Sequence, residues 1–291
     1  MTVIVSARDA ETTIAAAMRS ALRSLPSSAR MIVRSDGSTD GTLRAARSVD
    51  DRRVRVLEDD EWVGIPTSLN RLLEHVSTPL VTRLDSDDIS LPGRFGPQLR
   101  RIAAGIDFSF TTSLFWRAGT PIIAPQKPYA VTAESSPFFL LLANPFIQST
   151  MVARTEAISD LGGYRIVASE DFDLFVRAAT KGFALERLRV PRLIYRLSPT
   201  QITKQASWWA DQKSSPLVEQ AFNDLSTHAL GFVPSWFEWR RAQFPLESVP
   251  SGVDADIARF RSAIAGLRRS ARMPLERRLA KMAKRAAEAR R

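Results

Sequence analysis

Short apolar, β-branched segments alternate with helix-forming segments through the first half of this 291-residue chain. Strands that alternate with helices pair in parallel, because each helix carries the chain back to the same edge of the sheet. The alternation therefore predicts an α/β fold in which helices flank a mostly parallel central sheet. The expected strands are 2–7, 29–37, 53–59 and 79–88, and the expected helices are 11–24, a segment from about Thr42, and 65–76.

Beyond Leu91 the expected elements follow a less regular order. From about Thr203 the composition changes, first to tryptophans set among proline and serine, and then to a basic tail. These changes predict three parts: a domain at 1–203, a Trp-rich connecting region at 204–252, and a helical extension at 253–291. Within the domain we expect helices at 91–105, 136–144 and about 169–182, and strands at 107–117, 146–154 and within 183–197.

The chain has no cysteine and two histidines, His75 and His228, which limits the metal chemistry open to it. Disulfides, thiolate zinc sites and a cysteine nucleophile are excluded. A metal ion would need mainly oxygen ligands, which favour hard ions such as Mg²⁺ or Mn²⁺. The sequence opens on an apolar strand without a preceding basic stretch, and no later apolar run is long enough for a membrane span. We therefore expect a cytoplasmic protein.

The net charge of +10 is concentrated in the tail, where residues 255–291 hold twelve basic and three acidic side chains. The pattern is that of a basic amphipathic helix. Two interpretations stay open: the tail docks on an anionic membrane surface or a partner, or it packs its apolar stripe on the protein and leaves a solvated basic face. The apolar residues, spaced by three and four, are Val253, Ile257, Phe260, Ile264 and Leu267, extended by Leu275, Leu279 and Met282.

Three carboxylates, Asp85, Asp87 and Asp88, lie within four residues at the C-terminal end of the last of the early expected strands. In an extended backbone alternate side chains share a face, so Asp85 and Asp87 are expected to point the same way. Like charges this close repel, and a divalent cation or ordered N–H groups would stabilise them. A solvated acidic turn that caps the next helix is the alternative. The carboxyl ends of strands are where ligands bind in open α/β sheets.

Four segments stand along the chain in the order VSARDAETTI, VRSDGSTDGT, RLDSDDISLPGRF and GGYRIVASEDFDLFVRAA. In this order they resemble the motifs of glycosyltransferase family 2, whose members are inverting, sugar-nucleotide-dependent enzymes of the Rossmann-like GT-A fold. The resemblance runs from residue 2 to about 203. It implies a GT-A catalytic domain with a nucleotide-binding part at about 1–90 and an acceptor part at about 91–203.

The resemblance assigns the nucleoside of the donor to the first two segments. By position, Asp36 would accept a hydrogen bond from the N3–H group of a uracil-like base, and Ser6 and Arg8 would also contact the nucleotide. Taken alone, Asp36 is also consistent with a turn residue in its S-D-G-S loop. Relatives often carry an aromatic residue and an asparagine where this chain has Arg8 and Asp9.

The third segment would hold the donor diphosphate and a metal ion between its acids. By position, Asp85 would lie near the ribose and the water shell of the metal, and Asp87 would bind Mn²⁺ or Mg²⁺ directly. Asp88 is ranked below Asp87, as a ligand, a helix cap or an ion-pair partner.

A late segment departs from the family pattern. Many relatives place a histidine two residues after an arginine, and here Ser198 stands two residues after Arg196. If that histidine holds the metal or the diphosphate in relatives, Arg196, Gln201, Thr203 or water would take its part here. The chain also lacks a Gln-x-x-Arg-Trp segment, which argues against a processive polymer synthase.

The fourth segment supplies the base that an inverting transfer needs, because the acceptor hydroxyl must lose its proton as it attacks. By position Asp171 matches the family's base, Glu170 would contact the acceptor, and Asp173 lies within the next turn. The alternative is an acidic first turn that complements the helix dipole, and both roles can hold at once.

The predicted function is therefore an inverting, metal-dependent, non-processive glycosyltransferase that uses an NDP-sugar, with a UDP-sugar favoured, and a glycan or lipid-linked acceptor. Two other classes stay open. A nucleotidyltransferase shares the sheet and the acidic metal site, but usually has a Gly-rich basic loop where this chain reads SARDAETT. A basic nucleic-acid-binding module is the non-enzymatic alternative, although the basic charge is confined to the tail and no specific nucleic-acid partner is expected.

Overall fold

The computed structural model describes residues 1–198, 215–241 and 249–290, and the chain forms two compact units. The gaps contain Gln201, Thr203, Trp208 and Trp209, which therefore lie outside the described residues. The division expected from sequence follows composition, whereas these units follow packing. Unit 1 comprises Met1–Pro128, Phe146–Ile166 and Arg187–Pro199, and unit 2 comprises Tyr129–Pro145, Val167–Glu186 and Thr200–Arg291.

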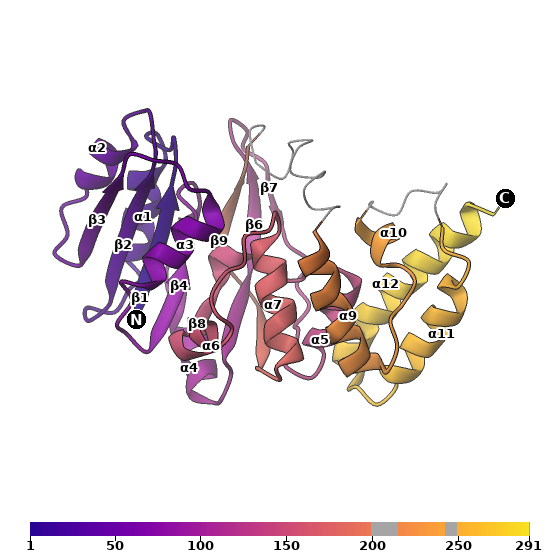
Figure 1. The fold of residues 1–291 in the computed structure, drawn as a ribbon. Coiled ribbons are helices and arrows are strands. Elements are labelled where there is room, and N and C mark those ends of the chain that lie inside the picture. Colours follow the sequence, from indigo (N-terminus) through magenta and orange to yellow (C-terminus); the bar gives the residue numbers. More distant parts are fainter. Residues whose placement is uncertain (199–214, 242–248, 291) are drawn as a thin grey trace. The chain divides into compact units, whose positions relative to one another are not determined.

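A mixed sheet of nine strands, in the order β3-β2-β1-β4-β8-β6-β9-β5 with β7 paired to β6, is the centre of unit 1 (Figure 1). Strands β3, β2, β1 and β4 are parallel, and antiparallel strands extend the sheet beyond β4. The expected α/β fold is confirmed. The strands are β1 (Thr2–Ala7), β2 (Arg30–Asp36), β3 (Val54–Asp59), β4 (Leu80–Arg83), β5 (Ile89–Ser90), β6 (Phe108–Arg117), β7 (Ile123–Pro125), β8 (Val152–Arg154) and β9 (Leu185–Leu197).

Helices of unit 1 connect and flank these strands. They are α1 (Ile14–Leu22), α2 (Thr42–Arg47), α3 (Ile65–Leu73), α4 (Phe95–Ala103), the 3₁₀ helix η1 (Gln148–Thr150) and α6 (Thr155–Asp160). Helix α1 buries Ile14, Met18 and Ala21, the same stripe that its spacing predicts. Strand β1 is apolar because parallel neighbours pair with it on both sides, so Val3, Ile4 and Val5 are almost fully buried. The loops after the parallel strands therefore gather at one edge of the sheet, which we call the carboxyl edge.

Unit 2 is built from helices that lie between residues 136 and 288 of the chain. They are α5 (Ser136–Leu142), α7 (Glu170–Thr180), α9 (Pro216–Leu230), α10 (Phe237–Arg241), α11 (Val253–Ala263) and α12 (Arg269–Glu288). Helix α7 packs against α5 and α9, and α12 packs against α5 and α11. None of the helices in the described part of the chain is both long enough and apolar enough to cross a membrane.

The basic tail contributes to the core of unit 2. Its apolar stripe is buried throughout, from Val253 in α11 to Met282 in α12. The Phe260 ring lies 5.8 Å from the Phe138 ring and 5.6 Å from the Trp236 ring, measured between centroids. Of the two interpretations left open by the sequence, packing of the stripe on the protein is the one observed. A stripe buried in this way is not available to a membrane, while basic residues of the same helices remain exposed.

Candidate functional site

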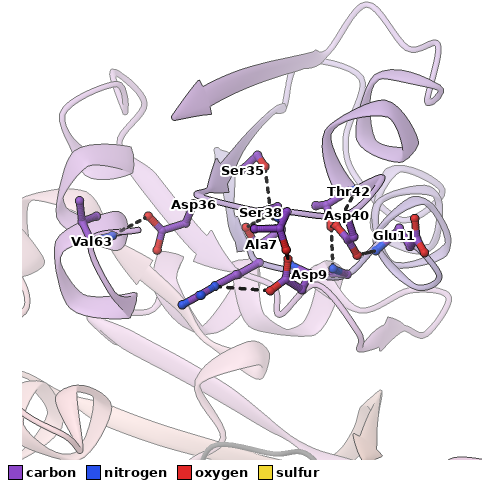
Figure 2. A network of polar contacts seen from close by, with 12 residues as sticks. Ala7, Asp9, Glu11, Ser35, Asp36, Ser38, Asp40, Thr42 and Val63 are labelled. Carbon is purple, nitrogen blue, oxygen red and sulfur yellow. Dashed lines mark hydrogen bonds and ion pairs between the residues drawn. The ribbon is translucent and has the colours of Figure 1, made fainter. Parts of the chain in front are cut away.

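The loops after β1 and β2 at the carboxyl edge are joined by reciprocal polar contacts (Figure 2). The Thr39 amide donates to Oδ1 of Asp9 at 2.9 Å, and the Glu11 amide donates to Oδ2 of Asp40 at 3.1 Å. Oε2 of Glu11 in turn accepts from the Gly41 amide at 2.9 Å. Asp9 has a φ of +46°, a left-handed conformation that aspartate tolerates better than most residues. These contacts fix both loops around the end of β2.

Asp36, the last residue of β2, lies in this region with 2% of its surface exposed. Its Oδ1 accepts from Nη1 of Arg34 at 3.1 Å and from the Val63 amide at 3.3 Å, the latter drawn in Figure 2. Arg34 is itself buried and also forms an ion pair with Asp59 of β3. The buried arginine, which the sequence analysis did not identify, fixes the Asp36 carboxylate at the end of β2.

The two other residues assigned to the nucleotide have different partners. The Ser6 hydroxyl is hydrogen-bonded to the Ser68 hydroxyl of α3 at 2.7 Å, so it joins α3 to β1. The Arg8 guanidinium lies 4.3 Å from the ring centroid of Trp62, in the loop after β3, and its Nε is 3.5 Å from Oδ2 of Asp9. Trp62 is a neighbour of the Asp36 region that the sequence analysis did not identify.

Residues 85–88 form a turn after β4 instead of an extended continuation of it. The Asp88 amide donates to the Asp85 carbonyl at 3.3 Å, and Asp85 is held by Nη2 of Arg83 at 2.9 Å and by the Ser149 hydroxyl, which accepts from its amide at 2.9 Å. The expectation that Asp85 and Asp87 share one face of an extended strand is therefore wrong.

The acids of this turn are crowded and partly buried. Burial and then the charge of Asp85 raise the pKa of Asp87 to about 6. Asp88 is almost fully buried, and burial together with the charges of Asp85 and Asp87 raises its pKa well above the usual value. Its Oδ1 accepts from the Arg196 amide at 2.9 Å, while its Oδ2 is buried without a partner. Burial and crowding thus disfavour the charged forms of Asp87 and Asp88, and a bound cation would stabilise those forms.

Besides Arg83, two further arginines lie near this turn. Nε of Arg196 donates to the Asp87 carbonyl at 2.9 Å, and its guanidinium lies 4.4 Å from the ring centroid of Trp116. Arg94, just before α4, is fully buried, and its Nη2 donates to the Arg83 carbonyl at 3.3 Å and to the Ser149 carbonyl. Burial lowers the pKa of Arg94 to about 10, partly offset by the charges of Asp88 and Asp85. Nothing in the sequence near Arg94 marks it as buried.

The described residues contain no group of three or more His, Asp or Glu side chains placed to hold a metal ion. Mg²⁺ usually takes only one or two carboxylates and completes its shell with water and substrate phosphates. Asp85 and Asp87 lie in one crowded acidic turn, so they could supply the one or two carboxylates that such an ion takes.

The acidic start of α7 belongs to unit 2 and contains acids in two different environments. Oδ2 of Asp171 accepts from Nδ2 of Asn144 at 3.2 Å, and its Oδ1 accepts from the Phe172 amide at 2.6 Å. Asp173 is fully buried and pairs with Nε of Arg177 at 2.8 Å, an arrangement that stabilises the helix. A carboxylate held like Asp171 can accept a proton, whereas Asp173 is committed to its ion pair.

Comparison with known proteins gives the family of the chain. Residues 2–161 match the family model described as glycosyl transferase family 2. EpsE of Bacillus subtilis (strain 168), named as a glycosyltransferase, is 28% identical over 195 residues, which are 63% of this chain and 68% of EpsE. The succinoglycan biosynthesis protein ExoU of Rhizobium meliloti (strain 1021) is 39% identical over 99 residues, which are 33% of this chain and 29% of ExoU.

A solved structure shows the same fold. The crystal structure of residues 1–349 of S. aureus TarS, in complex with UDP-GlcNAc, superposes with a TM-score of 0.60. At 16% sequence identity, the alignment covers 99% of this chain and 89% of that one, and it confirms the GT-A-like architecture. Since the family model covers more than half of the residues, the chain belongs to glycosyl transferase family 2 and is a glycosyltransferase.

Proposed function

We propose that this protein is an inverting, metal-dependent, non-processive glycosyltransferase that uses a UDP-sugar or another NDP-sugar. The observation that carries the proposal is the presence of Asp36 and the acidic turn at the same edge of the unit 1 sheet. The carboxylate of Asp36 can accept a hydrogen bond from an N–H group of a base. The acids of the turn can hold a cation beside a diphosphate. TarS, of the same fold, was solved with UDP-GlcNAc, which supports such a donor.

The metal would be held by Asp87 and Asp85. Asp88 is buried and would support the turn through its hydrogen bond with the Arg196 amide. A bound Mn²⁺ or Mg²⁺ ion would offset the charge that develops on the departing diphosphate. The guanidinium of Arg196 contributes positive charge beside Asp87. Many relatives have a histidine two residues further along the sequence, where this chain has Ser198. The position of the Arg196 guanidinium is fixed by the Asp87 carbonyl and the Trp116 ring.

The acceptor hydroxyl would lose its proton to Asp171 as it attacks the anomeric carbon from the face opposite the diphosphate. Asn144 holds one carboxylate oxygen of Asp171 and so restricts its orientation. Glu170, the first residue of α7, would contact the acceptor. The acceptor would be a glycan or a lipid-linked precursor. The names of ExoU, a succinoglycan biosynthesis protein, and AmsE, an amylovoran biosynthesis glycosyltransferase of Erwinia amylovora, support the glycan.

The proposed function predicts a preference among nucleotides. We expect UDP with Mn²⁺ to raise the melting temperature of the full chain more than GDP, dTDP or nucleoside triphosphates, measured by thermal shift. A panel of NDP-sugars should then show slow donor hydrolysis with one of them. Stronger stabilisation by triphosphates would favour a nucleotidyltransferase, and stabilisation by oligonucleotides alone would favour a nucleic-acid-binding protein.

We also propose that α11 and α12 bring the enzyme to an anionic membrane surface at the inner face of the cell membrane. Since their apolar stripe is buried, the attraction would be electrostatic and would act through the exposed basic face. This basic face includes Arg268, Arg269, Arg277 and Lys281, all exposed.

The membrane proposal predicts a selective effect of charge removal. Changing Arg268, Arg269, Arg277 and Lys281 to glutamine should weaken co-sedimentation with anionic liposomes more than tenfold, at about 1 kcal/mol per basic residue. The matched control carries the same loss of charge at exposed positions of unit 1: Arg19, Arg23, Arg52 and Arg55. Equal partitioning of both variants, or of the wild type between anionic and neutral vesicles, would contradict the proposal. Both variants keep the tail, because removing it would open the core of unit 2.

A further inference from the structure

Trp62 exposes 59% of its surface, which is unusual for the largest aromatic side chain. Trp236 and Trp239, by contrast, are almost fully buried. Leaving so much apolar ring in water forgoes the stabilisation that burial provides, so packing does not explain this residue. An exposed ring on a fixed backbone is suited to stacking on a planar ligand.

The backbone of Trp62 is fixed beside Asp36. Gly37, which follows Asp36, has a φ of +60°, and a Cβ atom there would lie 2.4 Å from the backbone nitrogen of Trp62. On the other side of the tryptophan, the Val63 amide donates to Oδ1 of Asp36 at 3.3 Å. The loop after β3 therefore lies directly on the loop that carries Asp36, and the glycine permits this close approach.

Arg8 fixes the ring from the loop after β1. Its guanidinium lies 4.3 Å from the centroid of the indole, within the range of a cation–π contact. Asp9 contacts the Nε of Arg8 at 3.5 Å, and Asp9 is held in turn by the Thr39 amide. The Arg8 side chain is itself 42% exposed. Two flat groups from different loops thus form an open stack next to a buried carboxylate.

We propose that Arg8 and Trp62 form the platform on which the nucleobase of the donor stacks. The aromatic surface would then come from the loop after β3, whereas relatives often have an aromatic residue at the position of Arg8 in the opening turn. A base stacked there could direct an N–H group to Asp36, so one contact would supply affinity and the other would select the base. This inference rests on the proposed sugar-nucleotide donor and names the residues that bind its heterocycle.

The test compares a ligand that has a base with one that lacks it. Calorimetric titration of the full chain with UDP and with inorganic pyrophosphate, both with Mn²⁺, would be made for the wild type, Trp62→Ala, Trp62→Phe and Arg8→Ala. We expect Trp62→Ala to weaken UDP binding roughly tenfold to a hundredfold, as base–aromatic stacks do, and to leave pyrophosphate binding unchanged. Trp62→Phe should restore most of the UDP affinity, and Arg8→Ala should show a smaller loss.

Ile123→Ala is the matched control, since Ile123 is another exposed apolar residue of unit 1, and it should change neither affinity. All variants should keep the wild-type melting temperature, because the substituted side chains are exposed. Unchanged UDP affinity in Trp62→Ala would overturn the platform, and an equal loss of UDP and pyrophosphate would show that the stack only clamps the loops. A wild type that binds pyrophosphate but no nucleoside diphosphate would instead contradict the proposed function itself.

Discussion

Replacing Asp87 with asparagine should lower sugar transfer by orders of magnitude and leave the fold intact. Asparagine keeps the shape of the side chain but removes the charge that binds a hard cation. The substitution also removes a carboxylate whose pKa is raised to about 6 by burial and then by the charge of Asp85, so the melting temperature should not fall. The measurements are initial rates of transfer at saturating Mn²⁺ and a thermal melt of the same preparation.

Asp50→Asn is the control, because Asp50 is an exposed acid of unit 1 and its charge should not matter to transfer. Chelation offers an independent test on the wild type. Treatment with EDTA should abolish transfer, and added Mn²⁺ or Mg²⁺ should restore it. Near-normal transfer in the presence of EDTA would remove the metal from the proposed mechanism, whatever the Asp87 variant shows.

Replacing Asp171 with asparagine should lower kcat by about 100- to 10,000-fold, the range typical of losing a general base. The amide cannot take the acceptor proton, although it can keep the place of the carboxylate beside Asn144. The dissociation constant for UDP should stay within a few fold of wild type, because Asp171 lies outside the nucleotide loops in the chain. Rates at saturating donor and calorimetric titration with UDP would separate the two effects.

Two neighbouring acids provide the controls for Asp171. Glu170→Gln should have a much smaller effect on kcat, because Glu170 is assigned to acceptor contact alone. Asp173→Asn should instead lower the melting temperature, since it would leave Arg177 without its buried carboxylate partner. A collapse of UDP affinity in Asp171→Asn would place that residue in the nucleotide site and contradict its role as the base.

The parallel half of the fold was predictable because its signals are local. Each of β1, β2 and β3 is a short β-rich run next to a helix of clear period, and each forms within a few residues of the expected place. The helix after β2 begins at Thr42 as expected, and the Thr42 amide donates to Oδ1 of Asp40 at 2.9 Å. The positions of Asp36 and the acidic turn at the carboxyl edge follow from the same alternation.

What could not be predicted depends on contacts between distant residues. The turn at 85–88 is closed by Ser149 and by the Arg196 amide, which lie 64 and 108 residues from their partners. In the sequence Arg94 resembles an ordinary surface arginine. In the structure it is buried, donates to the Ser149 carbonyl and interacts with the charge of Asp88. The roles assigned to the site residues stay predictions.

The packing of the tail has a consequence for synthesis of the protein. Nη2 of Arg278 donates to the Tyr129 hydroxyl at 2.6 Å, which joins residues 149 positions apart, and Phe138 meets Phe260 in the same core. Domains generally fold as units during synthesis, beginning with the N-terminal one. Unit 2 cannot complete its core until α12 has left the ribosome, so the face of α5 that packs on α12 stays exposed until then. Nascent chains that stall before α12 would therefore expose apolar surface and be substrates for chaperones, and unit 2 would reach its folded form only at the end of translation.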